Sequence, residues 1–182
     1  FDEVQCGMGR TGKLFAHEWA GVTPDIMMVA KGIGGGFPLG AVLATEAAAV
    51  GMVAGSHGST YGGNPLGCAV GAKVVELVAD DAFLSDVGQK GARFRQGLEG
   101  LVAAHPTVFE AVRGQGLMLG LKMKVEPRGF MVHLRDHHHL LTVAAGDNTL
   151  RLLPPLVIGD AEMDEFFDKL SAGAADFKPD AA

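Results

Sequence analysis

The first strong hydrophobic pattern in the chain is a short apolar run, "IMMVA" at residues 26–30, which lies between Thr23-Pro24-Asp25 and a glycine-rich stretch. A continuous run of this length is typical of a strand that is buried on both faces of a parallel sheet. Residues 41–44 have the same character. Residues 1–5 resemble the end of a further buried strand whose first half is absent, so we expect this chain to be part of a longer protein.

Helical spacing begins in the middle of the chain. Asn64 and Pro65 form the N-cap and first-turn pair that starts many helices. Apolar residues then recur at helical spacing, namely Leu66, Val70, Val74, Leu77 and Val78. A second helix is predicted from about residue 84 to residue 104, where His105-Pro106 ends it.

The hydrophobic period changes to two after residue 106. An alternation of apolar and smaller or polar residues predicts a half-exposed strand at 117–125. A strand at 108–113 precedes it, and Gly114-Gln115-Gly116 joins the two as an antiparallel pair. The remaining predicted elements are a short helix at 130–138, strands at 141–144 and 150–153, a closing helix at 160–170, and a frayed tail from residue 172. The first half is therefore predicted to be α/β and the second half α+β.

Composition and charge narrow the function classes. The 182 residues carry a formal net charge of −6, which argues against nucleic acid or an anionic membrane as the main partner. No apolar stretch is long enough to span a membrane, and two cysteines fit a reducing compartment, so we expect a cytoplasmic protein with a small-molecule partner. Glycine is enriched, with 27 residues, so the backbone must turn sharply or approach something closely.

Several motifs have an ordinary explanation. "GMGRTG" at residues 7–12 matches the dinucleotide pattern, but no sustained helical stripe follows it, so a nicotinamide or flavin site is only a minor alternative. "GIGGGFPLG" lacks the Lys-Ser/Thr of a phosphate-binding loop. His137-His138-His139 would point in three directions on a helix, so we interpret them as a solvated face and predict no metal site. Cys6 and Cys68 are interpreted as packing thiols.

Three charged residues are harder to explain as scaffold. Asp2 lies at the C-terminal end of a predicted strand and Lys31 lies just past the end of the next, and ligands of open parallel sheets bind at that edge. Arg151, in "NTLRLLPPLVI", lies among apolar residues before a rigid Pro154-Pro155, a setting suited to binding a carboxylate. Considered singly, each residue also has a structural interpretation, as a cap, a snorkelling lysine or a member of a buried ion pair. Together they supply an amine nucleophile, an acid for a ring nitrogen and a carboxylate clamp, which is the set that pyridoxal phosphate chemistry requires.

Three long blocks make the chain similar to a known family: "FDEVQCGMGRTGKLFAHEWAGVTPDIMMVAKGIGGGFPLGAV", "HGSTYGGNPLGCAV" and "LRLLPPLVI". They resemble the class III (ornithine-type) pyridoxal phosphate aminotransferases. The resemblance implies a fold type I transferase, of which this chain is the C-terminal part. Residues 1–63 would end the large cofactor-binding domain, residues 64–82 would form a connecting helix, and residues 83–182 would form the small α+β domain. The phosphate-binding loop and part of the substrate pocket would then lie upstream.

The resemblance also assigns roles to individual residues. Lys31 would form the Schiff base with pyridoxal phosphate and would then move the proton between the substrate carbon and the cofactor. Asp2 would pair with the pyridine nitrogen, Val4 would pack on the ring, and Gln5 would hydrogen-bond the ring hydroxyl. Thr60 would reach the cofactor phosphate of the other subunit of a homodimer. Arg151 would bind the substrate, through the α-carboxylate of glutamate and of 2-oxoglutarate.

The implied reaction is the transfer of the terminal amino group of N-acetylornithine to 2-oxoglutarate, a step in arginine biosynthesis. Alternatives are the family's reactions on ornithine, succinylornithine, succinyl-diaminopimelate or 4-aminobutyrate. A cofactor-less structural remnant and the dinucleotide module of residues 7–12 also remain open. The 182 residues by themselves are expected to be inactive, because the phosphate loop would be missing. The family expectation places threonine where this chain has Cys6, and residues 124–139 fit the family less well.

Overall fold

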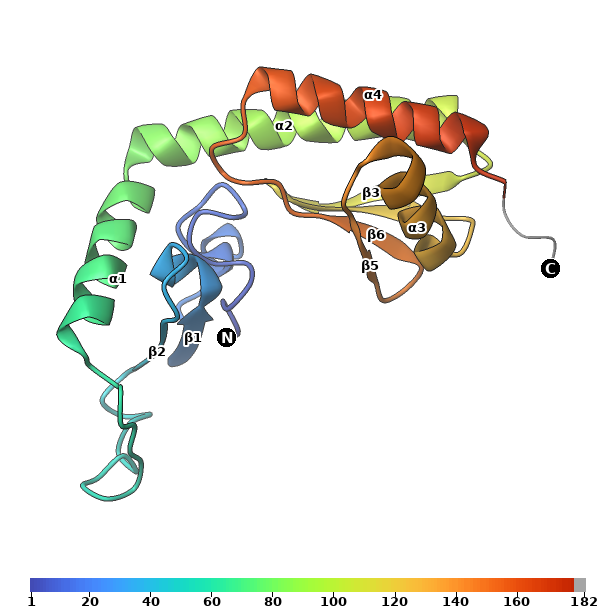
Figure 1. Cartoon of the computed structure of the whole chain (residues 1–182). Coiled ribbons are helices and arrows are strands. Elements are labelled where there is room, and N and C mark those ends of the chain that lie inside the picture. Colours follow the sequence, from blue (N-terminus) through green and yellow to red (C-terminus); the bar gives the residue numbers. More distant parts are fainter. Residues whose placement is uncertain (179–182) are drawn as a thin grey trace. The chain divides into compact units, whose positions relative to one another are not determined.

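The computed structural model describes residues 1–178 and contains two compact units, residues 1–86 and the residues from Val87 onward (Figure 1). The first unit contains two strands, two short 3₁₀ helices and one α-helix. The second contains a four-stranded sheet with its helices. Helix α2 (Asp81–Ala104) carries the chain from the first unit into the second.

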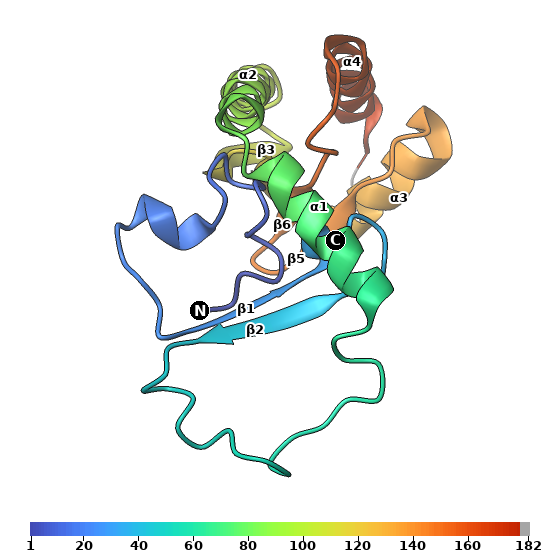
Figure 2. The same ribbon diagram turned by 90° about the vertical axis from the view of Figure 1, so that its left-hand side faces the viewer.

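The two strands of the first unit form an antiparallel pair. Strand β1 (Ile26–Ala30) pairs with β2 (Gly40–Ala44), with Ile26 opposite Ala44 (Figure 2). The segment at the start of the chain lies along β1 in the parallel sense, through a bridge between Asp2 and Met28. Hydrogen bonds from the Glu3 N–H to the Met28 carbonyl (2.9 Å) and from the Met28 N–H to the Phe1 carbonyl (3.0 Å) hold this parallel contact.

Burial along β1 corrects one expectation from the sequence. Met27 and Val29 are buried, but Ile26 and Met28 are 46% and 42% exposed, so the strand is covered on one face only by the described residues. The neighbouring β2 is exposed along its whole length. The prediction of a strand buried on both faces is therefore wrong for this chain. An apolar run shows that both faces can be buried, but it cannot show which elements cover them.

The predicted helix after Asn64 is confirmed as α1 (Pro65–Val78). The Asn64 side chain accepts a hydrogen bond from the Gly67 N–H at 2.7 Å, and Pro65 occupies the first turn, where its missing N–H costs nothing. A Cβ atom added at Gly71 would lie 2.6 Å from Leu39 Cδ2, so this glycine allows α1 to pack closely on the segment that follows β1.

The second unit is built on an antiparallel sheet with the order β3-β4-β6-β5. Its strands are β3 (Phe109–Gln115), β4 (Met118–Met123), β5 (Val143–Ala145) and β6 (Thr149–Leu152). Helices α3 (Pro127–His138) and α4 (Asp160–Asp176) join α2 in covering it. Figure 1 shows α2 and α4 side by side along the sheet, where the Phe94 ring lies 4.8 Å from that of Phe166, centroid to centroid.

Alternation in β4 was predicted correctly. Leu119, Leu121 and Met123 are buried, whereas Lys122 points outward and donates to the Asp147 carboxylate at 2.6 Å. The core of this unit lies between the sheet and the helices. Its fully buried large side chains include Phe94, Leu98, Phe109, Leu117, Leu121, Met123, Phe130, Leu134, Leu150, Met163 and Leu170.

Three helix boundaries differ from the prediction, and the first is the start of α2 at Asp81 rather than at about residue 84. Helix α3 begins three residues earlier than expected, because the Glu126 carboxylate caps the backbone N–H groups of Arg128 and Gly129. Helix α4 continues to Asp176, so the prediction of a frayed tail from residue 172 is wrong for the described residues. Gly173 and Ala174 are buried, and packing of this kind keeps a terminal turn ordered.

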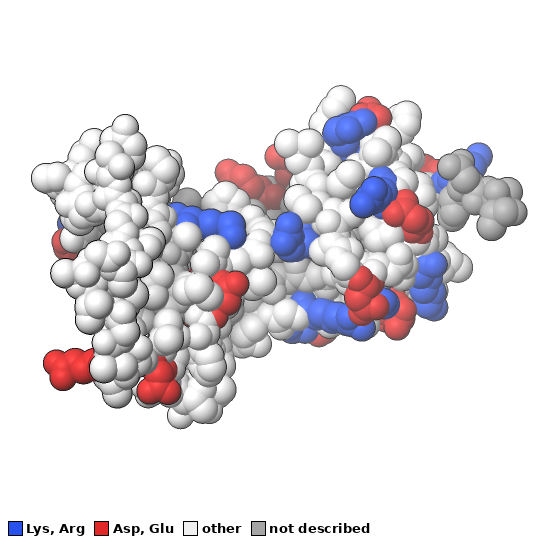
Figure 3. Space-filling view, turned by 90° about the horizontal axis from the view of Figure 1, so that it is seen from below, with Lys and Arg blue, Asp and Glu red and all other residues white. Residues whose placement is uncertain are grey.

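Charged side chains of both signs are interspersed on the face shown in Figure 3. In the second unit, Arg113 and Lys122 both form ion pairs with Asp147. None of the helices in residues 1–178 is both long and apolar enough to cross a bilayer.

Candidate active site

Asp2 and Lys31 both lie next to strand β1 of the first unit. The parallel bridge places Asp2 beside Met28, and Lys31 follows the last residue of β1 directly. Both side chains are exposed. Asp2 lies within the short parallel bridge, and Lys31 lies beyond the last residue of β1.

The backbone of Lys31 is in an unusual conformation. Its φ is +50°, in the left-handed region that non-glycine residues rarely occupy, and it opens the 3₁₀ helix η2 (Lys31–Gly34). Such a conformation costs about 1–3 kcal/mol and persists only where surrounding structure enforces it. Contacts between η2 and α1 provide that support. The same conformation occurs at four other non-glycine residues, so it agrees with a special role for Lys31 but does not assign one.

The other predicted cofactor residues fall in two places. Val4 and Gln5 are half-buried in the turn directly after Asp2, and the Val4 N–H donates to Asp2 Oδ1 at 2.9 Å. This local hydrogen bond orients the Asp2 carboxylate. Thr60 lies elsewhere, in the irregular and almost wholly exposed stretch between β2 and α1. The structure thus places Asp2, Val4 and Gln5 together and leaves Thr60 in a separate loop.

A buried glutamate that the sequence analysis did not single out organises the turn after Asp2. Glu3 is 2% exposed and accepts hydrogen bonds from the Ala16 N–H (3.0 Å) and the His17 N–H (2.8 Å). The His17 ring lies 3.1 Å from the same carboxylate. Burial would raise the pKa of Glu3, but the hydrogen bonds from Ala16, Cys6 and His17 together hold it below its ordinary value. Only the folded chain brings residues 16 and 17 back to Glu3.

Cys6 belongs to the same cluster. Its thiol donates to Glu3 Oε2 at 3.1 Å and to the Asp2 carbonyl at 3.3 Å. Burial and the adjacent Glu3 carboxylate raise the pKa of Cys6 to about 11. A thiol of that pKa is almost entirely protonated near neutral pH and is a poor nucleophile. The interpretation of Cys6 as a packing thiol is supported.

Replacing Glu3 by glutamine tests this cluster. Glu3→Gln keeps the side-chain size but loses the charge that accepts several donors, so we expect it to lower the free energy of unfolding by about 2 kcal/mol. Urea unfolding of the full-length protein measures the change. Glu18→Gln is the matched control, because Glu18 is exposed and accepts one backbone hydrogen bond, from Phe15. Equal effects of the two variants would show that Glu3 has no special role.

The structure agrees with the expectation for the glycine motif at residues 7–12 but not for one of the three consecutive histidines. Residues 4–11 form consecutive turns and no helix opens at Gly12, where φ is +91°, so "GMGRTG" lacks the strand-to-helix geometry of a dinucleotide fingerprint. The expectation of a solvated face at residues 137–139 is wrong for His138. Its side chain is 14% exposed and hydrogen-bonds Asp176. His137 and His139 are exposed, as predicted.

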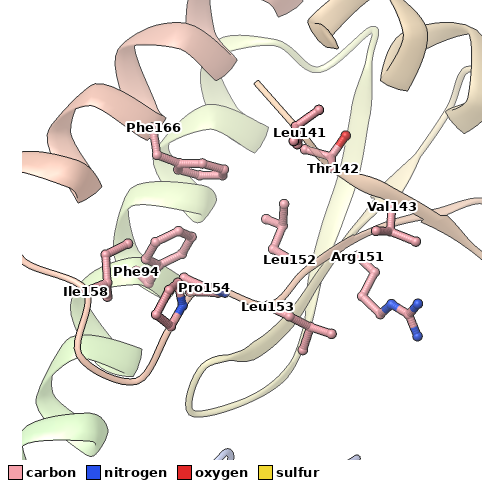
Figure 4. A pocket seen from close by; sticks show the side chains of 11 residues that line it. Phe94, Leu141, Thr142, Val143, Arg151, Leu152, Leu153, Pro154, Ile158 and Phe166 are labelled. Atoms are coloured by element: carbon pink, nitrogen blue, oxygen red, sulfur yellow. The ribbon is translucent and has the colours of Figure 1, made fainter. Parts of the chain in front are cut away.

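Arg151 lies in the second unit, in the middle of β6. It pairs with Gly120 of β4 and with Val143 of β5, and it lies on the opposite face of the strand from Leu150 and Leu152, which are buried. A cavity of about 270 Å³ adjoins it. Figure 4 shows the guanidinium group directed away from the Phe94 and Phe166 rings, which line another part of the cavity.

The walls of this cavity are mostly apolar. They include Leu141, Leu152, Pro154 and Ile158, together with the aromatic rings. Thr142 adds a hydroxyl that is buried and has no hydrogen-bond partner among the described residues. An arginine and a hydroxyl at an otherwise apolar cavity are suited to a ligand with a carboxylate.

The model of the family "Aminotransferase class-III" matches residues 1–173, and the chain belongs to this family of pyridoxal-phosphate-dependent enzymes. Among curated proteins, it is 67% identical over 175 residues to an acetylornithine aminotransferase of Rhodobacter capsulatus. It is 59% identical over 174 residues to the Mesorhizobium japonicum protein of the same name. These alignments cover 96% of this chain but 44% and 43% of the relatives, so the chain spans less than half of their length.

Solved structures agree on the fold. The N-acetylornithine aminotransferase of Stenotrophomonas maltophilia K279a superposes with a TM-score of 0.81 at 38% identity, over 96% of this chain and 46% of that one. Ornithine δ-aminotransferase of Plasmodium falciparum gives a TM-score of 0.86 at 33% identity, over 96% of this chain and 45% of that one. The expected fold class, that of a fold type I aminotransferase, is therefore confirmed.

Proposed function

We propose that the complete protein transfers the terminal amino group of N-acetylornithine to 2-oxoglutarate, with pyridoxal phosphate as cofactor. The observation that carries the proposal is that Asp2 and Lys31 both lie next to β1, Asp2 bridged to Met28 and Lys31 directly after the strand with a φ of +50°. The 67% identity to an acetylornithine aminotransferase supports this substrate. In this proposal the complete protein acts in arginine biosynthesis. It is a homodimer and is located in the cytoplasm.

The residues of this chain fit the cofactor chemically. Asp2 offers an exposed carboxylate for the pyridine nitrogen, and the Val4 N–H holds that carboxylate in place. Lys31 offers an exposed primary amine. Val4 would contact the ring face, Gln5 the ring hydroxyl, and Thr60 the phosphate in the partner subunit. When bound, pyridoxal phosphate would supply an electron sink next to the carbon that loses a proton.

Each of these side chains has a separate task. The Asp2 carboxylate would keep a proton on the pyridine nitrogen, because an adjacent negative charge favours the protonated ring. The Lys31 amine would bond to the cofactor at rest and would carry a proton once the substrate displaces it. Arg151 would bind the substrate carboxylate through two parallel N–H donors, which fix the orientation of the substrate as well as its affinity.

A substrate panel tests the proposal on the full-length protein. We expect kcat/KM for N-acetylornithine to exceed the values for ornithine, succinylornithine, succinyl-diaminopimelate and 4-aminobutyrate by at least about tenfold, with 2-oxoglutarate as acceptor. Glutamate formation is the readout. A preference for ornithine would favour a second candidate function, ornithine transamination. The ornithine aminotransferase of Plasmodium falciparum superposes with a TM-score of 0.86, against 0.81 for the N-acetylornithine enzyme. The absence of any cofactor-dependent turnover would contradict both.

A further inference from the structure

Three side chains that the proposed reaction does not use converge where two helices end. His133 and His138 lie on α3, and Asp176 is the last residue of α4. The Nε2 atoms of His133 and His138 lie 2.7 and 3.1 Å from Asp176 Oδ1. The ligand-type atoms of all three residues lie within 4.8 Å of one another. We refer to these three residues as the His-Asp cluster.

The close packing of α3 on α4 produces this convergence. A Cβ atom added at Gly173 would lie 2.4 Å from Leu134 Cδ2 and 3.2 Å from His138 Cδ2. Glycine at position 173 therefore lets α3 approach α4 and brings His138 to Asp176. The buried Leu134 lies between the two histidines in sequence and anchors this turn of α3 in the core. The cluster thus stands on rigid helices whose positions the core fixes.

The backbone around the cluster favours a cation. Helix α3 ends at His138 and helix α4 ends at Asp176. Unpaired carbonyl groups give each helix C-terminus a partial negative charge, and two such ends meet here. The Asp176 carboxylate adds a full negative charge, and its side chain is 57% exposed, which leaves an approach from solvent. Both histidines are mostly buried, at 17% and 14% exposed, so their rings are held in place.

Basic side chains near the cluster restrict the kind of cation that it can bind. Lys124, Arg128 and Lys178 line a hollow beside His133, together with the Glu126 carboxylate. Glu126 is engaged by the backbone N–H groups at the start of α3. The positive groups disfavour a cation that is held by charge alone. Their repulsion matters less for a metal that forms directional bonds to imidazole nitrogen, because those bonds add to the binding energy.

We propose that the His-Asp cluster binds a zinc-type divalent cation and thereby links α3 to the end of α4. Two imidazole nitrogens and one carboxylate oxygen are the donors that Zn²⁺ prefers, and three protein ligands leave a fourth position for water. Ligand atoms around a tetrahedral zinc are separated by roughly 3.3 Å, so small side-chain rotations suffice. His137 lies one turn after His133, with ring centroids 4.9 Å apart, and is a further imidazole near that position.

Zinc binding to the full-length protein without a histidine tag tests the proposal. The protein is first treated with a chelator, dialysed, and titrated with Zn²⁺ in competition with a chromophoric chelator. We expect wild type to bind one equivalent per chain more tightly than Asp176→Asn and His138→Gln do. Loss of an outer-shell partner weakens metal binding by about 10–100-fold, so loss of a ligand should weaken it at least tenfold. Zn²⁺ should also raise the thermal midpoint of wild type but not of these variants.

His139→Asn provides the matched control. It removes an exposed imidazole next to the cluster, and asparagine tolerates the left-handed backbone at this position, where φ is +52°. This control should bind zinc as wild type does. The proposal would be overturned if wild type bound no more zinc than Asp176→Asn, or if His139→Asn lost the same equivalent. Circular dichroism of each variant without metal shows whether the variant is folded. Asparagine was chosen at position 176 because its side chain keeps a hydrogen-bond acceptor and so favours normal folding.

Discussion

Lys31→Ala in the full-length protein is expected to lower turnover with N-acetylornithine at least about a thousandfold while the protein still folds. The proposed amine has two tasks, as covalent partner of the cofactor and as proton carrier, and general acid–base catalysis by itself contributes about 10²–10⁴-fold. Folding should be unaffected, because the Lys31 side chain is exposed and alanine keeps the same Cβ atom, so the backbone strain at φ +50° does not change. Steady-state kinetics and thermal unfolding measure both effects.

Two further variants separate the amine from the charge. Lys31→Arg keeps a positive charge but has no nucleophilic amine near neutral pH, so it should be as inactive as Lys31→Ala. Lys73→Ala is the matched control, since Lys73 is exposed on α1 and pairs with Glu76 at 2.6 Å. Borohydride treatment should attach the cofactor mass to the peptide that contains Lys31 in wild type only. Ordinary turnover in Lys31→Ala, or attachment at another lysine, would contradict the assignment.

Arg151→Lys is expected to impair the half-reaction with glutamate and 2-oxoglutarate roughly a hundredfold more than the half-reaction with N-acetylornithine. A lost bidentate contact to a carboxylate costs on the order of 3 kcal/mol, which corresponds to that factor. Lysine keeps the charge but not the planar pair of donors. In the proposed binding mode, N-acetylornithine presents its terminal amine to the cofactor and keeps its own α-carboxylate far from Arg151.

Single-turnover spectra with each substrate separately measure the two half-reactions. Arg113→Lys is the matched control, because Arg113 is an exposed arginine of the same sheet that pairs with Asp147. It should leave both half-reactions unchanged. Equal losses in both half-reactions of Arg151→Lys, or a fall in thermal midpoint large enough to explain them, would show that Arg151 is structural.

Most elements were predictable because their signals are local. The cap at Asn64, the alternation in β4 and the break at His105-Pro106 each act within a few residues, and the helices and strands lie where these signals place them. The same holds for the candidate chemistry. Lys31 was identifiable as a candidate because it follows an apolar run directly, and Asp2 because it lies in a strand-like segment at the start of the chain.

Tertiary structure decided what depends on residues distant in sequence. The sequence could not show that β1 is covered on one face, that Glu3 gathers donors from residues 16 and 17, or that α4 stays ordered to Asp176. It also gave no sign that Asp176 meets His133 and His138, which precede it by 43 and 38 positions. Local preference acts over a turn or a strand, whereas burial and side-chain convergence arise only when helices pack. The sequence by itself therefore determined the elements and the catalytic candidates, and packing determined what surrounds them.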